Sequence, residues 1–354
     1  MADVRTVSVA NAEKFIAKVL AAGGVPTDDA KQVGQLMVCS DLAGADGHGI
    51  FRLPAYMKRI EAGGANLHPQ IVVERDRGAS ALLNGDNALG HLVMAKAVDL
   101  AISKAREFGV GWVGSHHGNH SGAASVYVRM IAEAGLVGVY MAVGNANHMA
   151  PWGGVDLLLS TNPIAIAVPA KNRPIVLLDM ATTVAAYGKV KLAAQRGEQM
   201  PQGWMMDRQG KPLTDPQRSS EGSLLPIGDY KGYGLALMVS LLAGSLNGAA
   251  AGKQTIDFNA HHDLVTNTGQ VVLAIDPSAF GDVDAFLDRV TKVVEDIASS
   301  TRLPSVDSIH IPGEGAAATA AKRMAEGIPV SDELLRSLNE CAARFGVEPL
   351  LTQS

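Results

Sequence analysis

Apolar residues recur every three or four positions over long parts of the chain, and this spacing is typical of amphipathic helices. At the start we expect a helix over about 10–22, ended by Gly23 and Gly24, and a second helix from an N-cap at Thr27 to about Leu42. The same spacing predicts further helices, one from Pro54 and others over 89–108, 121–134, 231–246, 282–298, 314–326 and 331–344.

Short apolar runs between turn-forming residues predict the strands. They fall at 71–74, 81–84, 110–114, 136–143, 163–169, 174–179 and 271–276. The polar stretch 202–228 is expected to be an exposed loop region. The pattern therefore predicts a mixed α/β fold without internal repeats. We expect a helical N-terminal segment (1–75), two α/β regions (76–200 and 201–310), and C-terminal helices that return to the core (311–354).

Composition is that of a soluble globular protein, because 47% of the 354 residues are hydrophobic and 18% are charged. The formal net charge of −5 argues against a nucleic-acid partner, which would favour a basic surface. The most apolar stretch, 234–244, is too short to span a bilayer, and the N-terminal residues show no secretory pattern. Cys39 and Cys341 are expected to be buried free thiols. We therefore expect a cytoplasmic protein without a membrane partner.

The segment 41–57 carries the most informative chemistry. It places His48, which titrates near neutral pH, four residues before the fixed cation Arg52. If the backbone turns here, as Gly47 and Gly49 allow, the two side chains can converge. A guanidinium can hold the carboxylate of a small 2-oxo acid while an imidazolium protonates its carbonyl oxygen. The pair predicts a catalytic His48 and a substrate-binding Arg52.

Simpler interpretations of the same residues stay open. A histidine in a glycine-rich loop is often an ordinary surface residue, and Arg52 could serve only at a helix start. The group that orients His48 is also undecided, between Asp46 and a backbone carbonyl.

The letters Gly-x-Gly-x-x-Gly at 109–114 match a dinucleotide-binding fingerprint. That fingerprint requires a strand, then the glycines, then a helix, so that the pyrophosphate meets a helix N-terminus. Here a long predicted helix comes first and a strand follows. We interpret these glycines as a helix C-cap and a buried strand.

Three histidines cluster at 116, 117 and 120, and His116 and His120 have the four-residue spacing of two metal ligands. Neither a glutamate between them nor a third ligand nearby supports zinc, so no metal is expected. Ser121 beside His120 lacks the Gly-x-Ser-x-Gly elbow of a hydrolase. His148, His261 and His262 suit solvated loops.

A series of motifs resembles the type 2 malate/L-lactate dehydrogenase family, which is NAD(P)-dependent and also contains ureidoglycolate, sulfolactate and diketogulonate enzymes and cyclic imine reductases. The first family pattern is met by Asp41, Gly44, His48, Gly49, Arg52, Pro54 and Tyr56. Further matches follow in the expected order at 119–123, 150–154, 160–163, 178–183, 230–234 and 311–314. Together they cover nearly the whole chain.

The resemblance implies a mainly antiparallel sheet in a cofactor fold that is not a Rossmann fold, with NAD or NADP as cofactor. It also implies a small 2-hydroxy or 2-oxo acid substrate and a homodimer. By family position, His120 is a second candidate for proton transfer and Thr161 a substrate contact. The expected cofactor contacts are His120, Ser121, Gly122, Asp179, Met180, Ala181, Thr182, Thr183, Lys231, Gly232, Gly313, Glu314 and Gly315.

Two positions depart from the family pattern. Gly47 stands where many members have serine, and Lys189 stands where the cyclic imine reductases have aspartate. Because both partners of that relay are missing, a 2-hydroxy acid dehydrogenase of the malate, lactate or sulfolactate type is favoured. A cyclic imine reductase and a ureidoglycolate-type dehydrogenase are the alternatives, and a ligand-binding protein without turnover is the rival class. The choice between NAD and NADP stays open.

Overall fold

The computed structural model describes residues 4–353, and for Val4 and Gln195 the backbone alone. The helices are α1 (Val9–Ala22), α2 (Thr27–Leu42), α3 (Leu53–Glu61), α4 (Gly90–Phe108), α5 (Ala124–Glu133), α6 (Tyr187–Arg196), α7 (Tyr230–Val239), α8 (Val283–Ala298), α9 (Glu314–Glu326) and α10 (Asp332–Arg344). The strands are β1 (Val4–Val7), β2 (Val72–Arg77), β3 (Ser80–Ala88), β4 (Val110–Gly118), β5 (Val137–Ala142), β6 (Ile164–Val168), β7 (Val176–Met180), β8 (Met205–Asp207), β9 (Gly222–Leu224), β10 (Thr268–Ile275) and β11 (Ile328–Ser331). Every helix and strand that the sequence pattern predicted has a counterpart.

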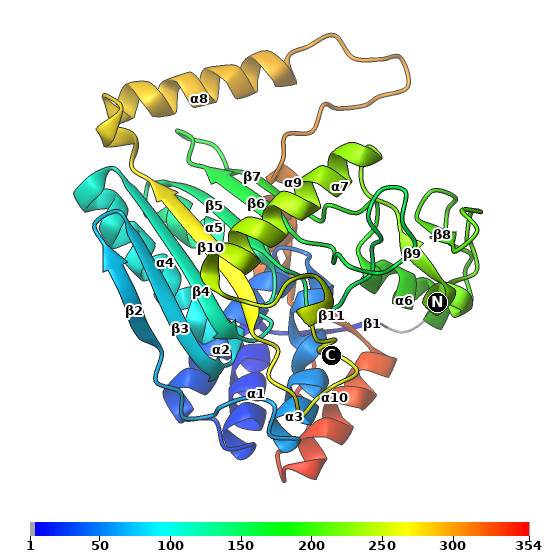
Figure 1. Cartoon of the computed structure of the whole chain (residues 1–354). Coiled ribbons are helices and arrows are strands. Elements are labelled where there is room, and N and C mark those ends of the chain that lie inside the picture. Colours follow the sequence, from blue (N-terminus) through cyan, green and yellow to red (C-terminus); the bar gives the residue numbers. More distant parts are fainter. Residues whose placement is uncertain (1–3, 354) are drawn as a thin grey trace.

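The centre of the molecule is a mixed, mostly antiparallel sheet in the order β2-β3-β4-β10-β5-β6-β7. The β3–β4 pair is parallel, and the other neighbouring pairs are antiparallel. Helices α4 and α5 cover one face (Figure 1). Their buried side chains, such as Val98 and Tyr127, share a core with Tyr140 and Val272 of the sheet. This apolar layer fixes the strand ends that lead into the candidate site.

Strand β10 lies between β4 and β5, although more than a hundred residues separate it from either in sequence. The region 201–310 therefore contributes a central strand to the same sheet as the region 76–200. The division into these regions stays a prediction.

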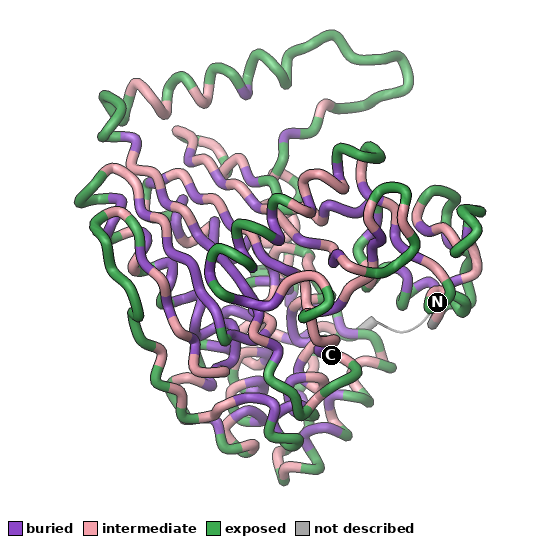
Figure 2. The backbone as a smooth tube through the Cα atoms, viewed as in Figure 1, coloured by how far each residue is buried: buried purple, intermediate pink, exposed green. Residues whose placement is uncertain are grey.

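The two ends of the chain meet in a second, helical layer. Helices α1, α2, α3 and α10 bury Ile16, Met37, Met57 and Leu338 in one apolar cluster. Strands β1 and β11 pair antiparallel beside it. Figure 2 shows the buried inner sides of these helices against their exposed outer sides. This layer supports the segment that carries His48 and Arg52.

Several local details differ from the sequence prediction. Helix α2 starts at Thr27 itself, with Pro26 as the N-cap, so the Thr27 side chain does not cap it. Helix α7 ends at Val239 and continues as a π-helical turn to Gly244. The stretch 202–228 contains the β8–β9 hairpin. Helix α6 and the pair β1–β11 were not predicted from the sequence pattern.

The glycines at 109–114 lie where a helix gives way to a strand. Gly109 has φ +83° and caps α4, and β4 follows at once. A Cβ at Gly111 would lie 2.2 Å from the backbone oxygen of Ala101, so glycine there lets α4 pack closely on β4. The glycines are structural, as their order in the sequence indicated.

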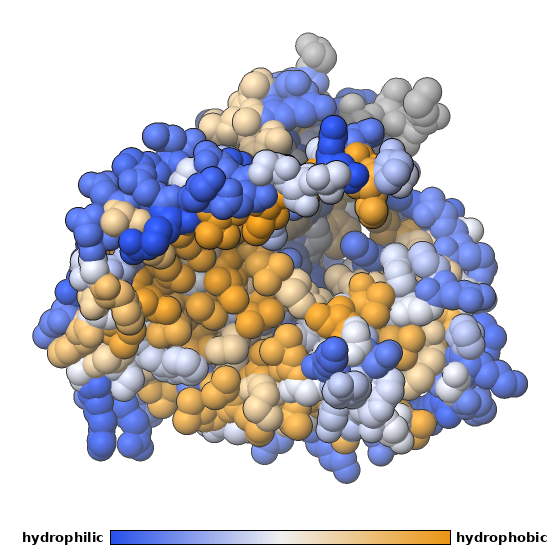
Figure 3. All heavy atoms as spheres, turned by 90° about the horizontal axis from the view of Figure 1, so that it is seen from above, coloured by the Kyte–Doolittle hydropathy of each residue, from blue (hydrophilic) through white to orange (hydrophobic). Residues whose placement is uncertain are grey.

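The outer part of the molecule carries much exposed apolar surface. Helix α8 runs across one end of the molecule and is joined to α9 by a long loop (Figure 1). Seen from that side, hydrophobic residues form a broad area (Figure 3). Exposed large apolar side chains on α7, on the turn after it and on α8 are Met238, Leu241, Leu242, Leu246, Val293 and Ile297. No helix within residues 4–353 is long and apolar enough to cross a membrane.

The two cysteines are unpaired, and one of them corrects the sequence prediction. Cys341 is buried, as expected, but Cys39 is exposed on α2. Position 39 falls on the outer side of a helix whose other face is packed into the core.

Candidate active site

The segment 41–52 folds into a tight double turn between α2 and α3. Two 3-10 turns, Asp46–His48 and Ile50–Arg52, replace a single helical turn. The carboxylate of Asp41 accepts a hydrogen bond from the Ile50 backbone N–H at 2.8 Å. A Cβ at Gly49 would lie 1.9 Å from that carboxylate, so only glycine fits there. Burial raises the pKa of Asp41 to about 7.

This double turn brings His48 and Arg52 to one place together with residues distant in sequence. The rings of His48 and His120 stack, with centroids 5.5 Å apart and an interplanar angle of 13°. The Tyr56 hydroxyl on α3 is hydrogen bonded to Nδ1 of His120 at 2.6 Å. Arg52 donates from Nε to the Gly47 carbonyl oxygen and from one terminal nitrogen to Oδ1 of Asn259, both at 3.1 Å. We call His48, Arg52, Tyr56 and His120 the active-site cluster.

The cluster is electrostatically unusual, because the pKa of each of its histidines lies well below the ordinary value. Burial, followed by the nearby Arg52 charge, lowers the pKa of His48 to about 4. The same two causes hold the pKa of His120 well below its usual value. The sequence prediction of a His48 that titrates near neutral pH is therefore corrected, since enclosure beside a fixed cation disfavours the imidazolium. In this state both rings can accept a proton.

Asp46 is not the group that orients His48. Its carboxylate is paired with Arg323 of α9, one of whose nitrogens lies 3.3 Å from Oδ2. Nδ1 of His48 is buried and has no hydrogen-bond partner among residues 4–353. The orienting group must therefore be sought elsewhere.

The predicted cofactor contacts that follow β7 are linked by hydrogen bonds to the start of α7. Thr182 donates from its backbone N–H and from its hydroxyl to the carbonyl oxygen of Thr161, at 2.9 and 3.0 Å. The Thr182 carbonyl accepts from the N–H of Ile227, whose own carbonyl accepts from the N–H of Gly232. Lys231 is exposed beside this connection. The structure thus brings Thr161, Thr182 and the first turn of α7 together.

A second group of predicted contacts lies around the end of β7. Asp179 accepts a hydrogen bond from the N–H of Ser125, in the first turn of α5, at 2.9 Å. Gly313 is the N-cap of α9, with φ +96°, and a Cβ there would lie 2.8 Å from the carbonyl oxygen of Ile175. Glu314 pairs with Arg173 at 3.0 Å. Its carboxylate is thus already engaged by the protein, which the sequence could not indicate.

Two further predicted residues lie in the turn that carries His120. Ser121 is buried and bonds Tyr140 and Gln270, at 3.0 and 2.9 Å, so its hydroxyl serves the interior. Gly122 has φ +81°. Met180 and Ala181 are partly exposed at the end of β7, and Gly315 is exposed in the first turn of α9.

The other histidines considered in the sequence analysis have different hydrogen-bond partners or stacking partners. Nε2 of His116 bonds Glu74 at 2.6 Å, whereas His120 bonds Tyr56, so the two do not share a ligand. No group of three His, Cys, Asp or Glu side chains within the described part of the chain could hold a metal ion. His148 corrects the prediction of a solvated loop, since its ring stacks on Tyr187 at 3.8 Å.

Helix α6 adds a cation that the sequence analysis missed. Nζ of Lys191 lies 5.7 Å from the centre of the Tyr187 ring. Burial, then the positive charge of Arg52, lowers the pKa of Lys191, while Asp257 acts in the opposite direction. No carboxylate of residues 4–353 lies within ion-pair distance of Lys191 or of Arg52. Two cations without carboxylate partners therefore act on the same region.

Asn259 was missed as well, because only the fold brings it to Arg52 from 207 positions away. Its own N–H donates to Asp257 at 2.8 Å, which fixes the loop. Tyr56 was part of the first motif but had no assigned role, and its spacing from Arg52 could have placed it beside the pair.

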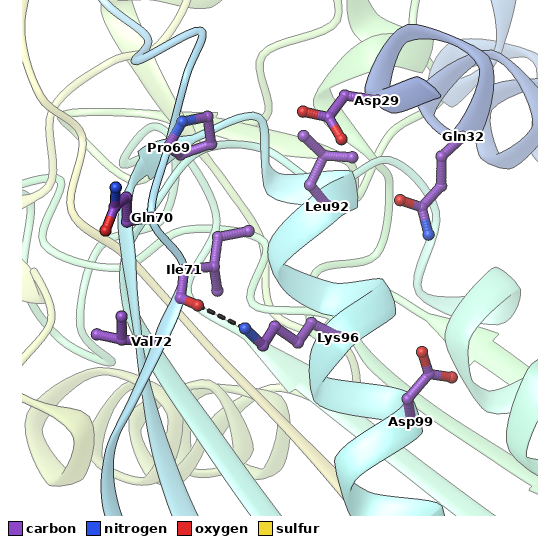
Figure 4. A pocket seen from close by; sticks show the side chains of 9 residues that line it. All are labelled: Asp29, Gln32, Pro69, Gln70, Ile71, Val72, Leu92, Lys96 and Asp99. Carbon is purple, nitrogen blue, oxygen red and sulfur yellow. Dashed lines mark hydrogen bonds between the residues drawn. The ribbon is translucent and has the colours of Figure 1, made fainter. Parts of the chain in front are cut away.

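A separate surface cavity lies away from this cluster. Its volume is about 510 Å³, and it is lined by α2, α4 and the segment before β2 (Figure 4). Lys96 closes one side by donating to the Ile71 carbonyl oxygen. None of its lining residues belongs to the active-site cluster.

Comparison with known proteins gives one consistent result. A family model described as malate/L-lactate dehydrogenase matches residues 7–339. The malate dehydrogenase of Pyrococcus horikoshii is 39% identical over 344 residues, which is 95% of this chain and 94% of that protein. Its solved structure superposes with a TM-score of 0.90, at 36% identity over 99% of each chain.

Two further relatives carry a cofactor in their names. The ureidoglycolate dehydrogenase (NAD(+)) of Escherichia coli is 33% identical over 92% of each chain. The (2R)-3-sulfolactate dehydrogenase (NADP(+)) of Chromohalobacter salexigens is 34% identical over 87% of this chain and 90% of its own.

Proposed function

The chain belongs to the malate/L-lactate dehydrogenase family, and from this premise we propose how its active site works. The protein is an NAD(P)-dependent dehydrogenase of small hydroxy acids. The proposal concerns the roles of individual residues, the class of acid and the assembly. Its main support is the position of Arg52, whose guanidinium is held by neutral oxygens beside two neutral imidazoles.

Arg52 binds the substrate carboxylate. A guanidinium has five N–H donors, and the two protein contacts leave a fork free for a planar carboxylate. Thr161 contributes a further polar contact. Fixing the carboxylate in this way places the neighbouring carbon beside the two imidazoles.

His48 accepts the proton of the substrate hydroxyl in the oxidation direction and returns it to the carbonyl oxygen in reduction. Its lowered pKa keeps the ring neutral, so one of its nitrogens is unprotonated before the reaction. His120, held through Nδ1 by the Tyr56 hydroxyl, is the second candidate for this role. Nδ1 of His120 also accepts from the Gly122 N–H, so the neutral ring carries its proton on Nε2, and only that nitrogen could take part.

The residues present fit a nicotinamide dinucleotide. Helices α7 and α9 begin without a side-chain cap, and the positive end of each helix dipole attracts phosphate oxygens. Lys231 adds a cation beside one of these helix starts. Asp179 and Thr183 offer oxygens at the end of β7. When bound, the cofactor supplies or accepts hydride. We propose that this fold is not a Rossmann fold, because its sheet is mostly antiparallel and the glycine pattern at 109–114 caps a helix.

We further propose that the preferred acid carries a second anionic group. Lys191 is close enough to Arg52 for its pKa to be lowered by that charge, and it has no carboxylate partner among the described residues. Malate and sulfolactate, which appear in the names of the related dehydrogenases, both carry two anionic groups. Asp257 offsets part of this positive charge, so we expect acids with one anionic group to react more slowly but not to be excluded.

Exposed apolar side chains on α7 and α8 support a homodimer, in which they would be covered. Composition supports a cytoplasmic location. The alternative activity is cyclic imine reduction, since a solved Δ1-piperideine-2-carboxylate reductase of Pseudomonas syringae superposes with a TM-score of 0.85 at 30% identity.

The test follows the absorbance of NADH and of NADPH with oxaloacetate, sulfopyruvate, pyruvate and a cyclic imine. Turnover of the first two above pyruvate supports the proposal. Lys191→Met should remove that preference, whereas Lys189→Met on the same helix should keep it. Turnover of the cyclic imine alone would establish the alternative, and equal turnover of all acids would reject the role of Lys191.

A further inference from the structure

A third histidine, His91, lies beside the active-site cluster and has no role in the mechanism above. It is the second residue of α4 and is 1% exposed. Its ring meets the Tyr56 ring edge to face, with centroids 5.5 Å apart and an angle of 83°. His91 therefore extends the cluster inward, behind Tyr56.

Close backbone contacts fix the position of His91. A Cβ at Gly90 would lie 2.1 Å from the Asn119 carbonyl oxygen, so the start of α4 abuts the turn that carries His120. A Cβ at Gly122 would lie 2.8 Å from Nε2 of His91 and 3.7 Å from the backbone oxygen of His48. The ring is thus held between the His120 turn and the His48 turn.

Three buried ring nitrogens of His48 and His91 have no hydrogen-bond partner in residues 4–353. They are Nδ1 of His48 and both Nδ1 and Nε2 of His91. Buried polar atoms in folded proteins are nearly always satisfied, by protein or by an internal water with two to four polar neighbours. Since Asp46 is engaged by Arg323, no carboxylate competes for Nδ1 of His48.

We propose that His91 is a positioning residue for His48. It holds one buried water against Nδ1 of His48, and this water fixes the orientation of the His48 ring and the nitrogen that carries its proton. A neutral imidazole suits this task because it has one donor and one acceptor. The N-terminal end of α4 favours that neutral form, since the helix dipole is positive there. With Nδ1 engaged, Nε2 of His48 is left to face the substrate.

This inference rests on the proposed role of His48, and two variants separate it from simple packing. His91→Gln keeps a donor and an acceptor, whereas His91→Leu keeps volume without either. Val93→Ala, on the same buried turn of α4, is the matched control for lost packing. Each is assayed for kcat, for the KM of nucleotide and acid, and for the pH dependence of kcat. The 15N NMR signals of His48, assigned with His48→Gln, report its tautomer.

We expect His91→Leu to lower kcat about 10-fold or more, part of the 100- to 10,000-fold that a positioned acid or base contributes. The nucleotide KM should stay unchanged, and His48 should pass from one tautomer to a mixture. His91→Gln and Val93→Ala should keep the His48 tautomer and the pH profile. An unchanged tautomer in His91→Leu, or equal losses of kcat in all three variants, would overturn the proposal. The NMR result does not depend on turnover, so a wild type that reduces no acid would reject the proposed function alone.

Discussion

Replacing Arg52 by lysine tests the carboxylate site most directly, because the charge is kept and only the donor geometry changes. Arginine has five N–H donors, and two are used by Gly47 and Asn259, which leaves three for a substrate. Lysine has three donors in all. If it kept both protein contacts, one donor would remain, so a two-pronged contact with a carboxylate becomes impossible.

The magnitude follows from the loss of one charged hydrogen bond. Such a bond contributes about 1.5–3 kcal/mol, and about 1.4 kcal/mol corresponds to a tenfold change in affinity. Arg52→Lys should therefore raise the KM of the acid about 10- to 150-fold. The affinity for NADH or NADPH should change by less than about threefold, because no proposed nucleotide contact involves Arg52.

The assay measures the KM of the best acid and the dissociation constant of the reduced nucleotide for the wild type and Arg52→Lys. Arg218→Lys is the control, since Arg218 forms an exposed ion pair with Glu221 away from the cluster. Equal weakening of acid and nucleotide binding would mean that Arg52 is a structural residue, and an unchanged KM for the acid would refute the carboxylate role.

Three other changes have defined outcomes. His48→Asn should lower kcat about 100- to 10,000-fold, and near-normal turnover would pass the proton-transfer role to His120. Arg59→Leu should lower the free energy of unfolding by about 2–5 kcal/mol, since buried Arg59 donates to Asn119 and to two backbone carbonyls. Denaturant titration measures this free energy, and a decrease below about 1 kcal/mol would contradict the prediction. Burial lowers the pKa of His91 to about 3, so the unfolded protein binds an extra proton below about pH 6.5 and stability must fall as the pH drops from there. His91→Gln should remove up to about 1.4 kcal/mol per pH unit of that fall, and identical slopes for both proteins would show that His91 is not buried as a neutral ring.

Much of the local structure could be predicted from the sequence, for a physical reason. Amphipathic spacing reports which face of a helix is buried, and it located every long helix within a few residues. The order of helix and strand around Gly109 is also the one that the sequence predicted. The short strands β1 and β11 were missed because they pair with each other from opposite ends of the chain.

The charges within the site could not be predicted in the same way. The sequence placed His48 near its ordinary pKa, but its enclosure beside Arg52 lowers that pKa to about 4. It left Asp46 as a candidate partner of His48, but Arg323 reaches Asp46 across 277 positions. Desolvation and pairing of this kind depend on neighbours supplied by the whole fold.

The chain alone determined the family, through the order and spacing of its motifs, and with it the type of reaction and cofactor. Only the tertiary structure decided which side chains gather around His48 and Arg52, since Tyr56, His91, His120 and Asn259 come from four separate segments. The spacing of residues along the chain determines local helices, strands and motifs. Burial, pKa and hydrogen-bond partners depend instead on residues that become neighbours only when the protein folds.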